Sequence, residues 1–153
     1  MAQVRKMGPP LDRDSMTYFA DLTPYSYSDD VYGPWQELLN VGWLEPGRPL
    51  PTGPVPEPFV AKLARLCKDP VAVMRGFHVC AIPPCTPRGW PPLEVTVDGE
   101  QVMLGHAEVR VGSGTCTWFA APTLVYHYVT VHDYQPPEAF IQAVLGSDRA
   151  RTE

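Results

Sequence analysis

Nineteen prolines among 153 residues constrain the fold of this chain more than any other feature. They make up about 12% of the chain, against about 5% in an average protein. Because proline lacks a backbone N–H and disrupts helix interiors and central strands, we expect short elements joined by long proline-rich loops. Residues 46–58 hold six prolines and are predicted to form one such loop. Apolar residues still make up 44% of the sequence, which is enough for a hydrophobic core.

Four segments are predicted to form short helices. The clearest is 57–67, where apolar residues recur every three to four positions and Lys62 points away from them. An earlier helix is expected to open at Gly33-Pro34 and to end at Gly42. The other two are residues 122–132, and the stretch from Pro136-Pro137 to Leu145.

Between the second and third predicted helices, the sequence alternates as strands do. The predicted strands are 76–82, 93–97, 101–104, 106–111 and 115–119. Asp98-Gly99 and Gly112-Ser113-Gly114 mark two hairpin turns. Strands grouped between helices, and too close for parallel crossovers, predict an α+β fold. We expect an antiparallel meander of four to five strands, with three to four short helices packed on one face.

The length predicts a single domain, placed at residues 16–146, with flexible tails at 1–15 and 147–153. The first residues lack the apolar stretch of a secretory signal, and no run approaches 18 apolar residues. We therefore expect a cytoplasmic protein without a membrane segment. Its four cysteines are then expected to be reduced thiols.

The net charge of -5 argues against nucleic-acid binding, because phosphate recognition needs clustered Lys and Arg. Residues 18–35 interleave aromatic rings with Asp21, Asp29 and Asp30. An acidic surface rich in tyrosine would suit a protein partner. The alternative is that these rings pack on the sheet or the helices and keep an irregular segment ordered.

His78, Cys80 and Cys85 are the strongest candidates for a chemical site. On a strand, residues i and i+2 share a face, so the His78 imidazole and the Cys80 thiol would point together. Cys85 follows in a loop stiffened by Pro83 and Pro84. Zn²⁺ takes four tetrahedral ligands from Cys and His, so three ligands would be local. The alternative is that Cys80 is an ordinary core cysteine.

The fourth ligand stays open among Cys67, His106, Cys116 and His127, and we select His127. His127 and His132 share one predicted helix but lie about 140° apart around it at 100° per residue. A straight helix would therefore not present both to one metal ion. His127 falls outside the apolar arc, where a histidine on the surface or at the rim of a cleft is the alternative.

Several phrases of the sequence, taken together, are similar to a family of small bacterial proteins, frequent in actinobacteria and myxobacteria, described as a domain of unknown function. These phrases are YFADLTPYSY (18–27), NVGWL (40–44), RGFHVC (75–80), AEVRV (107–111) and AAPTLVYHYVTVHDYQPPEAFIQAVL (120–145). The resemblance implies a bacterial, cytoplasmic, single-domain protein and no known reaction. Its His-x-Cys with a second nearby Cys maps onto His78, Cys80 and Cys85, and its YHYV phrase carries His127.

Three functions follow from these patterns. The first is a zinc-binding domain with a mainly structural Cys/His site. The second is an acidic interaction module of the immunity or accessory type, which docks a protein partner through residues 18–35 and holds no metal. The third is a thiol- or metal-dependent enzyme of a biosynthetic cluster, which needs a reactive cysteine or an open metal position. The sequence names no substrate, partner or oligomeric state.

Overall fold

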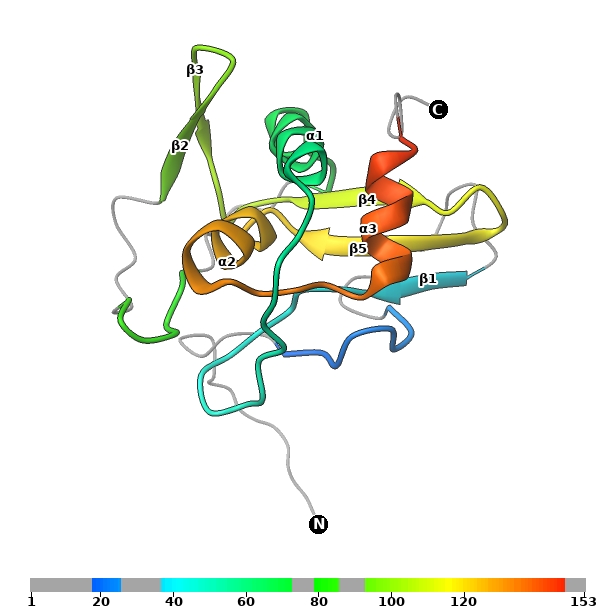
Figure 1. The fold of residues 1–153 in the computed structure, drawn as a ribbon, viewed down its shortest axis with the longest axis horizontal. Coiled ribbons are helices and arrows are strands. Elements are labelled where there is room, and N and C mark those ends of the chain that lie inside the picture. Colours follow the sequence, from blue (N-terminus) through cyan, green and yellow to red (C-terminus); the bar gives the residue numbers. More distant parts are fainter. Residues whose placement is uncertain (1–17, 26–36, 73–78, 86–92, 148–153) are drawn as a thin grey trace.

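The computed structural model describes residues 18–25, 37–72, 79–85 and 93–147. Within these ranges the chain is mixed α+β, with three helices and five strands in two small sheets (Figure 1). The predicted α+β class is confirmed. The predicted N-terminal tail lies outside the described residues, as does the C-terminal one except for Ser147.

The larger sheet has the order β1-β5-β4. Strand β5 (Thr117–Pro122) lies in the middle, antiparallel to β4 (Glu108–Gly112) and parallel to β1 (Glu37–Asn40). The β4–β5 hairpin was predicted, but the parallel strand β1 was not. The sequence pattern predicts a helix for the β1 segment, because a short apolar run such as Leu38-Leu39 fits either element.

The smaller sheet is the hairpin of β2 (Glu94–Val97) and β3 (Glu100–Met103). Its turn residues Asp98 and Gly99 have φ of 51° and 83°, as the predicted type I′ turn requires. This hairpin stands apart from the larger sheet in Figure 1. The predicted single meander is therefore wrong: the strands divide between two sheets, and β1 pairs in parallel through a crossover of many residues rather than with a close neighbour.

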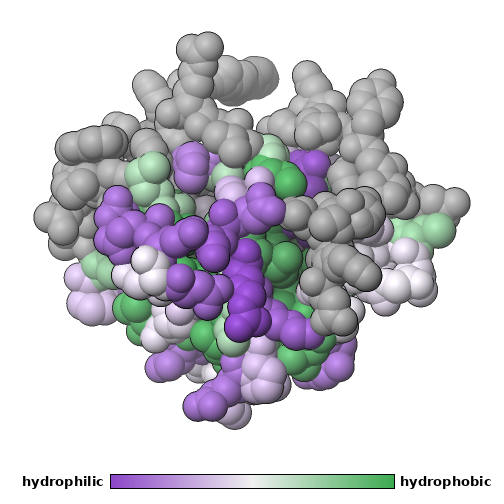
Figure 2. All heavy atoms as spheres, turned by 90° about the horizontal axis from the view of Figure 1, so that it is seen from above, coloured by the Kyte–Doolittle hydropathy of each residue, from purple (hydrophilic) through white to green (hydrophobic). Residues whose placement is uncertain are grey.

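Helix α1 (Glu57–Lys68) begins with proline in its first turn, where the missing N–H removes no helical hydrogen bond. Glu57 at its start and Lys68 at its end both favour the helix dipole. On its exposed side, Arg65 and Lys68 each lie 3.6 Å from Asp98 in the β2–β3 turn. Figure 2 looks down on this side of the molecule and shows hydrophilic residues gathered across its middle. The exposed ion pairs of Arg65 and Lys68 with Asp98 contribute at most about 1 kcal/mol each.

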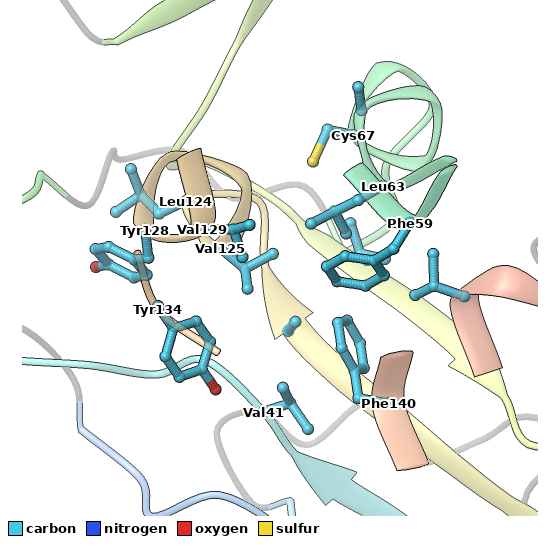
Figure 3. Packing of buried hydrophobic residues seen from close by; sticks show 14 of the residues in the cluster. Val41, Phe59, Leu63, Cys67, Leu124, Val125, Tyr128, Val129, Tyr134 and Phe140 are labelled. Atoms are coloured by element: carbon cyan, nitrogen blue, oxygen red, sulfur yellow. The ribbon is translucent and has the colours of Figure 1, made fainter. Parts of the chain in front are cut away.

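All three helices pack against the main core on one face of the larger sheet. Phe140 of α3 (Glu138–Leu145) lies edge-on to both Phe59 of α1 and Phe119 of β5, with ring centroids 6.0 Å apart in each pair. Figure 3 shows Phe59 and Phe140 facing one another between their helices, with α2 residues and Tyr134 completing the layer. The prediction that the helices share one face of the sheet agrees with this packing.

The opposite face of the larger sheet carries a second, smaller cluster. It consists of Tyr25, Leu38, Trp43 and Ala120, with Phe19 and Trp118 packed against it. Phe19 and Tyr25 show that the described part of segment 18–35, residues 18–25, covers the sheet. The remainder of that segment lies outside the described residues.

A buried polar network crosses this second face. The Tyr25 hydroxyl donates to Glu108 Oε2 at 2.8 Å and accepts from Arg110 Nη2 at 3.1 Å. Arg110 also donates to Glu108 Oε1 through Nε and Nη2, at 3.0 and 2.8 Å. Glu108 is 1% exposed, so its charge depends on these hydrogen bonds.

None of the helices in the described part of the chain combines the length and apolar character that a membrane crossing needs.

Candidate metal centre

Helix α2 (Val125–His132) supplies one half of the candidate site. It is held from below by the core residues Val125, Tyr128 and Val129. The helix ends at His132, because Asp133 takes a left-handed φ of 60° and the Tyr134 N–H turns back to the Tyr128 carbonyl at 3.1 Å. A left-handed residue directly after the last turn is a common end of a helix.

The loop of residues 79–85 supplies the other half. Cys80 and Ile82 anchor it in the main core, and the Cys85 N–H closes a turn by donating to the Ile82 carbonyl at 2.8 Å. The Pro83–Pro84 peptide bond within that turn is cis. Of the strand predicted at 76–82, residues 76–78 lie outside the described residues, and 79–82 form no strand. Two consecutive prolines offer no N–H to a strand ladder at its end.

Four side chains from these two elements converge on one point. Their metal-ligating atoms, the Sγ of Cys80 and Cys85 and a ring nitrogen of His127 and His132, all lie within 4.8 Å of one another. His132 Nε2 lies 3.3 Å from Cys80 Sγ and 3.5 Å from Cys85 Sγ. His127 Nε2 lies 3.5 Å from Cys85 Sγ. Two imidazoles and two thiols therefore face a common centre.

The separations fit a tetrahedral ion of zinc size. Zn–S bonds of about 2.3 Å and Zn–N bonds of about 2.05 Å, at the tetrahedral angle, place sulfur and nitrogen ligands about 3.6 Å apart. The three Sγ–Nε2 distances of 3.3, 3.5 and 3.5 Å are close to this edge length. The other separations among the four ligand atoms are no more than 4.8 Å.

Burial sets the protonation of the two histidines. It lowers the pKa of His127, and the neighbouring His132 charge lowers it further. Burial also lowers the pKa of His132, while Asp133 acts in the opposite direction. Both shifts favour the neutral imidazole, which is the form that binds a metal ion.

The thiols lie in an apolar setting. Burial raises the pKa of Cys80 to about 12, the Ile82 N–H opposes this, and Cys85 adds to it. The Tyr128 ring is buried in the core, and burial raises its pKa, with smaller contributions from Cys80 and Cys85. A bound cation would supply the positive charge that two thiolates need here.

Residues 17–145 match the family described as a domain of unknown function (DUF7919). The chain belongs to this family. The resemblance to a domain of unknown function is thereby confirmed. No protein of curated function and no solved structure matches the chain. Since the DUF7919 description assigns no activity, function has to be inferred from the side chains of the site.

The structure of this DUF7919 domain brings together three of the four predicted ligands, Cys80, Cys85 and His127. His78 lies outside the described residues. The cluster contains none of the other candidates for the fourth position, Cys67, His106 and Cys116. Cys67 instead faces the Thr123 carbonyl at 3.6 Å within the core, and Cys116 is exposed.

The argument from helix angles that separated His127 from His132 is wrong. The two ring centroids lie 5.1 Å apart. An angle measured around the helix axis ignores the reach of an imidazole, and the helix ends at His132, where the chain turns away. His127 is also buried, at 8% exposed, so it is not the surface histidine of the alternative interpretation.

One sequence signal does select His132. Cys80-x₄-Cys85 and His127-x₄-His132 fall at or within the ligand spacings that Cys₂His₂ zinc sites use, C-x₂₋₄-C and H-x₃₋₅-H. The two pairs are far apart, since Cys85 and His127 are 42 positions from one another. A search for compact motifs therefore misses the pattern, which a pairwise reading of Cys and His spacings would find.

Proposed function

We propose that this DUF7919 domain binds one Zn²⁺ ion through Cys80, Cys85, His127 and His132, and that the ion has a structural role. The observation that carries the proposal is the set of Sγ–Nε2 distances, 3.3 to 3.5 Å, close to the edge of a zinc tetrahedron. Zinc is the ion favoured by this donor set, because two thiolates and two imidazoles combine soft and borderline ligands in tetrahedral arrangement.

A structural role follows from the number of ligands. Catalytic zinc sites use three protein ligands and leave the fourth position to water or substrate, whereas structural sites take all four from the protein. Four side chains are available at this centre. Two thiolates also make the ion a weaker Lewis acid, so water activation is disfavoured. The third hypothesis was a thiol- or metal-dependent enzyme, and this ligand set gives no support to its metal-dependent form.

The ion would fasten a loop to a helix. Residues 79–85 form no strand or helix, and the ion would join them to the end of α2. Closing a long loop of chain in this way restricts the unfolded state, as a disulfide does. Because the ligands must be thiolates, we place the protein in a reducing compartment, the cytoplasm.

Metal analysis of untagged protein, purified without chelator, tests the proposal. We expect about one zinc per chain by plasma mass spectrometry, and its loss from Cys85→Ser. Cys116→Ser is the matched control, since Cys116 is an exposed cysteine outside the cluster and its replacement should leave the zinc content unchanged. Cobalt substitution should give the intense visible bands of a tetrahedral ion, together with thiolate charge-transfer absorption in the near-ultraviolet.

Protein that holds no zinc, and takes up none on titration in the presence of a reductant, would contradict the proposal. The four side chains would then form only weak S–H···N hydrogen bonds in the core.

A further inference from the structure

We propose that Cys80 and Cys85 are a redox-sensitive pair: a hydroperoxide oxidises them to a disulfide, and the disulfide releases the metal ion. This inference rests on the proposed zinc site and names its regulation. It concerns a covalent modification between two particular sulfurs of the chain.

The two sulfurs are close enough to join. Cys80 Sγ and Cys85 Sγ lie within 4.8 Å of one another, and a disulfide requires about 2.05 Å. Both face the same His132 Nε2, at 3.3 and 3.5 Å, so they approach the centre from neighbouring directions. In a zinc tetrahedron the same sulfurs would lie about 3.8 Å apart.

The backbone between them permits the approach. Both cysteines lie on the loop of residues 79–85, which is not paired into either sheet. The hydrogen bond from the Cys85 N–H to the Ile82 carbonyl turns the chain back toward Cys80. The other two cysteines have no such neighbour in the cluster: Cys67 is buried against the Thr123 carbonyl, and Cys116 is exposed elsewhere.

The two cysteines differ in exposure, which assigns their roles. Cys85 is partly exposed, whereas Cys80 is 4% exposed. A dissolved oxidant therefore meets Cys85 first. Metal coordination would keep its sulfur as a thiolate, the nucleophilic form, and Cys80 would lie behind it as the resolving thiolate.

The chemistry balances in two steps. The Cys85 thiolate attacks the hydroperoxide, an S–O bond forms, the O–O bond breaks, and the departing alkoxide or hydroxide takes a proton from water. The Cys80 thiolate then attacks the Cys85 sulfenic sulfur, the S–S bond forms, and hydroxide leaves and is protonated. The two thiolates together lose two electrons. An organic hydroperoxide is reduced to an alcohol and water, and hydrogen peroxide is reduced to two waters.

Loss of the ion follows from the ligand count. A disulfide sulfur carries no negative charge and is a poor zinc ligand, so only His127 and His132 remain. Zinc sites of this type need four ligands, and both retained imidazoles are neutral. The ion therefore dissociates, and the loop of residues 79–85 loses its metal link to α2 while it gains a local covalent one.

The test treats zinc-loaded protein with hydrogen peroxide and follows three quantities. A chromogenic chelator reports zinc release, a thiol reagent counts free cysteines, and mass spectrometry of peptides locates the cross-link. We expect one zinc released for each Cys80–Cys85 disulfide, a loss of two thiols per chain, and recovery of zinc binding after reduction. Cys116→Ser, which lacks the exposed cysteine, should behave in the same way.

Two results would overturn the proposal. One is zinc that stays bound, with all thiols intact, under peroxide in excess. The other is zinc release accompanied only by a cross-link through Cys116 or by over-oxidised Cys85. If the purified protein binds no zinc at all, the proposed function and the release of metal both fail. A two-electron thiol oxidant applied to that metal-free protein then decides whether the Cys80–Cys85 disulfide forms.

Discussion

The Nε2 atom of His132 lies 3.3 Å from the Sγ atom of Cys80, although 52 positions separate the two residues. The contact joins the last residue of α2 to a loop that belongs to neither sheet. It depends on the helix ending at His132, since the left-handed Asp133 then leads the chain away from the site. The end of α2 thus fixes where His132 meets the cysteines of the loop.

Replacing His132 should abolish tight zinc binding while leaving the fold in place. His132 is only partly buried, so His132→Ala removes a ligand without opening a large cavity. We expect zinc affinity to fall at least about 100-fold, because three ligands remain where a structural site needs four. Thr130→Ala is the control, since Thr130 is exposed on the same helix and outside the cluster. Competition with a chromogenic chelator measures both affinities, and equal values for the two variants would contradict the assignment.

Removing the metal should lower thermal stability. An ion present at about 1,000 times its dissociation constant stabilises the folded state by about 4 kcal/mol. For a domain of this size, 1 kcal/mol shifts the melting temperature by about 2–4 °C, so a strong chelator should lower Tm by about 10 °C. Calorimetry with and without chelator measures the shift, and the Cys85→Ser variant should show none.

Local patterns predicted most of the elements, because their signals lie within the elements themselves. The apolar spacing of α1 and the Asp98-Gly99 turn are examples. The β1 strand was missed because its partner, β5, lies about 80 positions away: Glu37 pairs with Thr117. Pairing at that distance depends on tertiary packing and leaves no periodicity in a four-residue strand.

The site was predicted in part for a similar reason. Residue type and local spacing predict Cys80 and Cys85, whereas His127 is one of four candidates for the remaining position. The angle between His127 and His132 around a straight helix excludes His132 as a second ligand. That angle neglects the length of the side chains and the end of the helix. Where the C-terminus of a helix is marked by a following Asp-Tyr-Gln-Pro-Pro, as at 133–137, a histidine in its last turn deserves consideration as a ligand.

The buried Glu108 should be among the most sensitive positions outside the metal centre. Glu108→Gln removes the charge that accepts two hydrogen bonds from Arg110 and one from Tyr25. Leaving a buried guanidinium with a neutral neighbour should lower the free energy of unfolding by about 3 kcal/mol. Glu100→Gln, at an exposed pair with Lys68, should change it by less than about 0.5 kcal/mol. Urea denaturation measures both, and similar values for the two variants would show that the network adds little.

Gly42, two residues beyond the end of β1, should tolerate a side chain poorly, because it packs directly against Val125, the first residue of α2. Its φ is +78°, and a Cβ there would meet Val125 Cγ2 at 2.8 Å. Gly47 is the matched control: its φ is +88°, but a Cβ would meet nothing within 4 Å. Gly47→Ala should therefore lower the free energy of unfolding by only about 1 kcal/mol, because alanine disfavours the left-handed backbone. Gly42→Ala should lower the free energy of unfolding by the same amount and by about 1–3 kcal/mol more, because the added methyl overpacks against the Val125 side chain. Since Val125 is the first residue of α2, the same displacement should also weaken zinc binding at His127. A Gly42→Ala variant as stable as Gly47→Ala would show that Gly42 does not pack this closely against Val125.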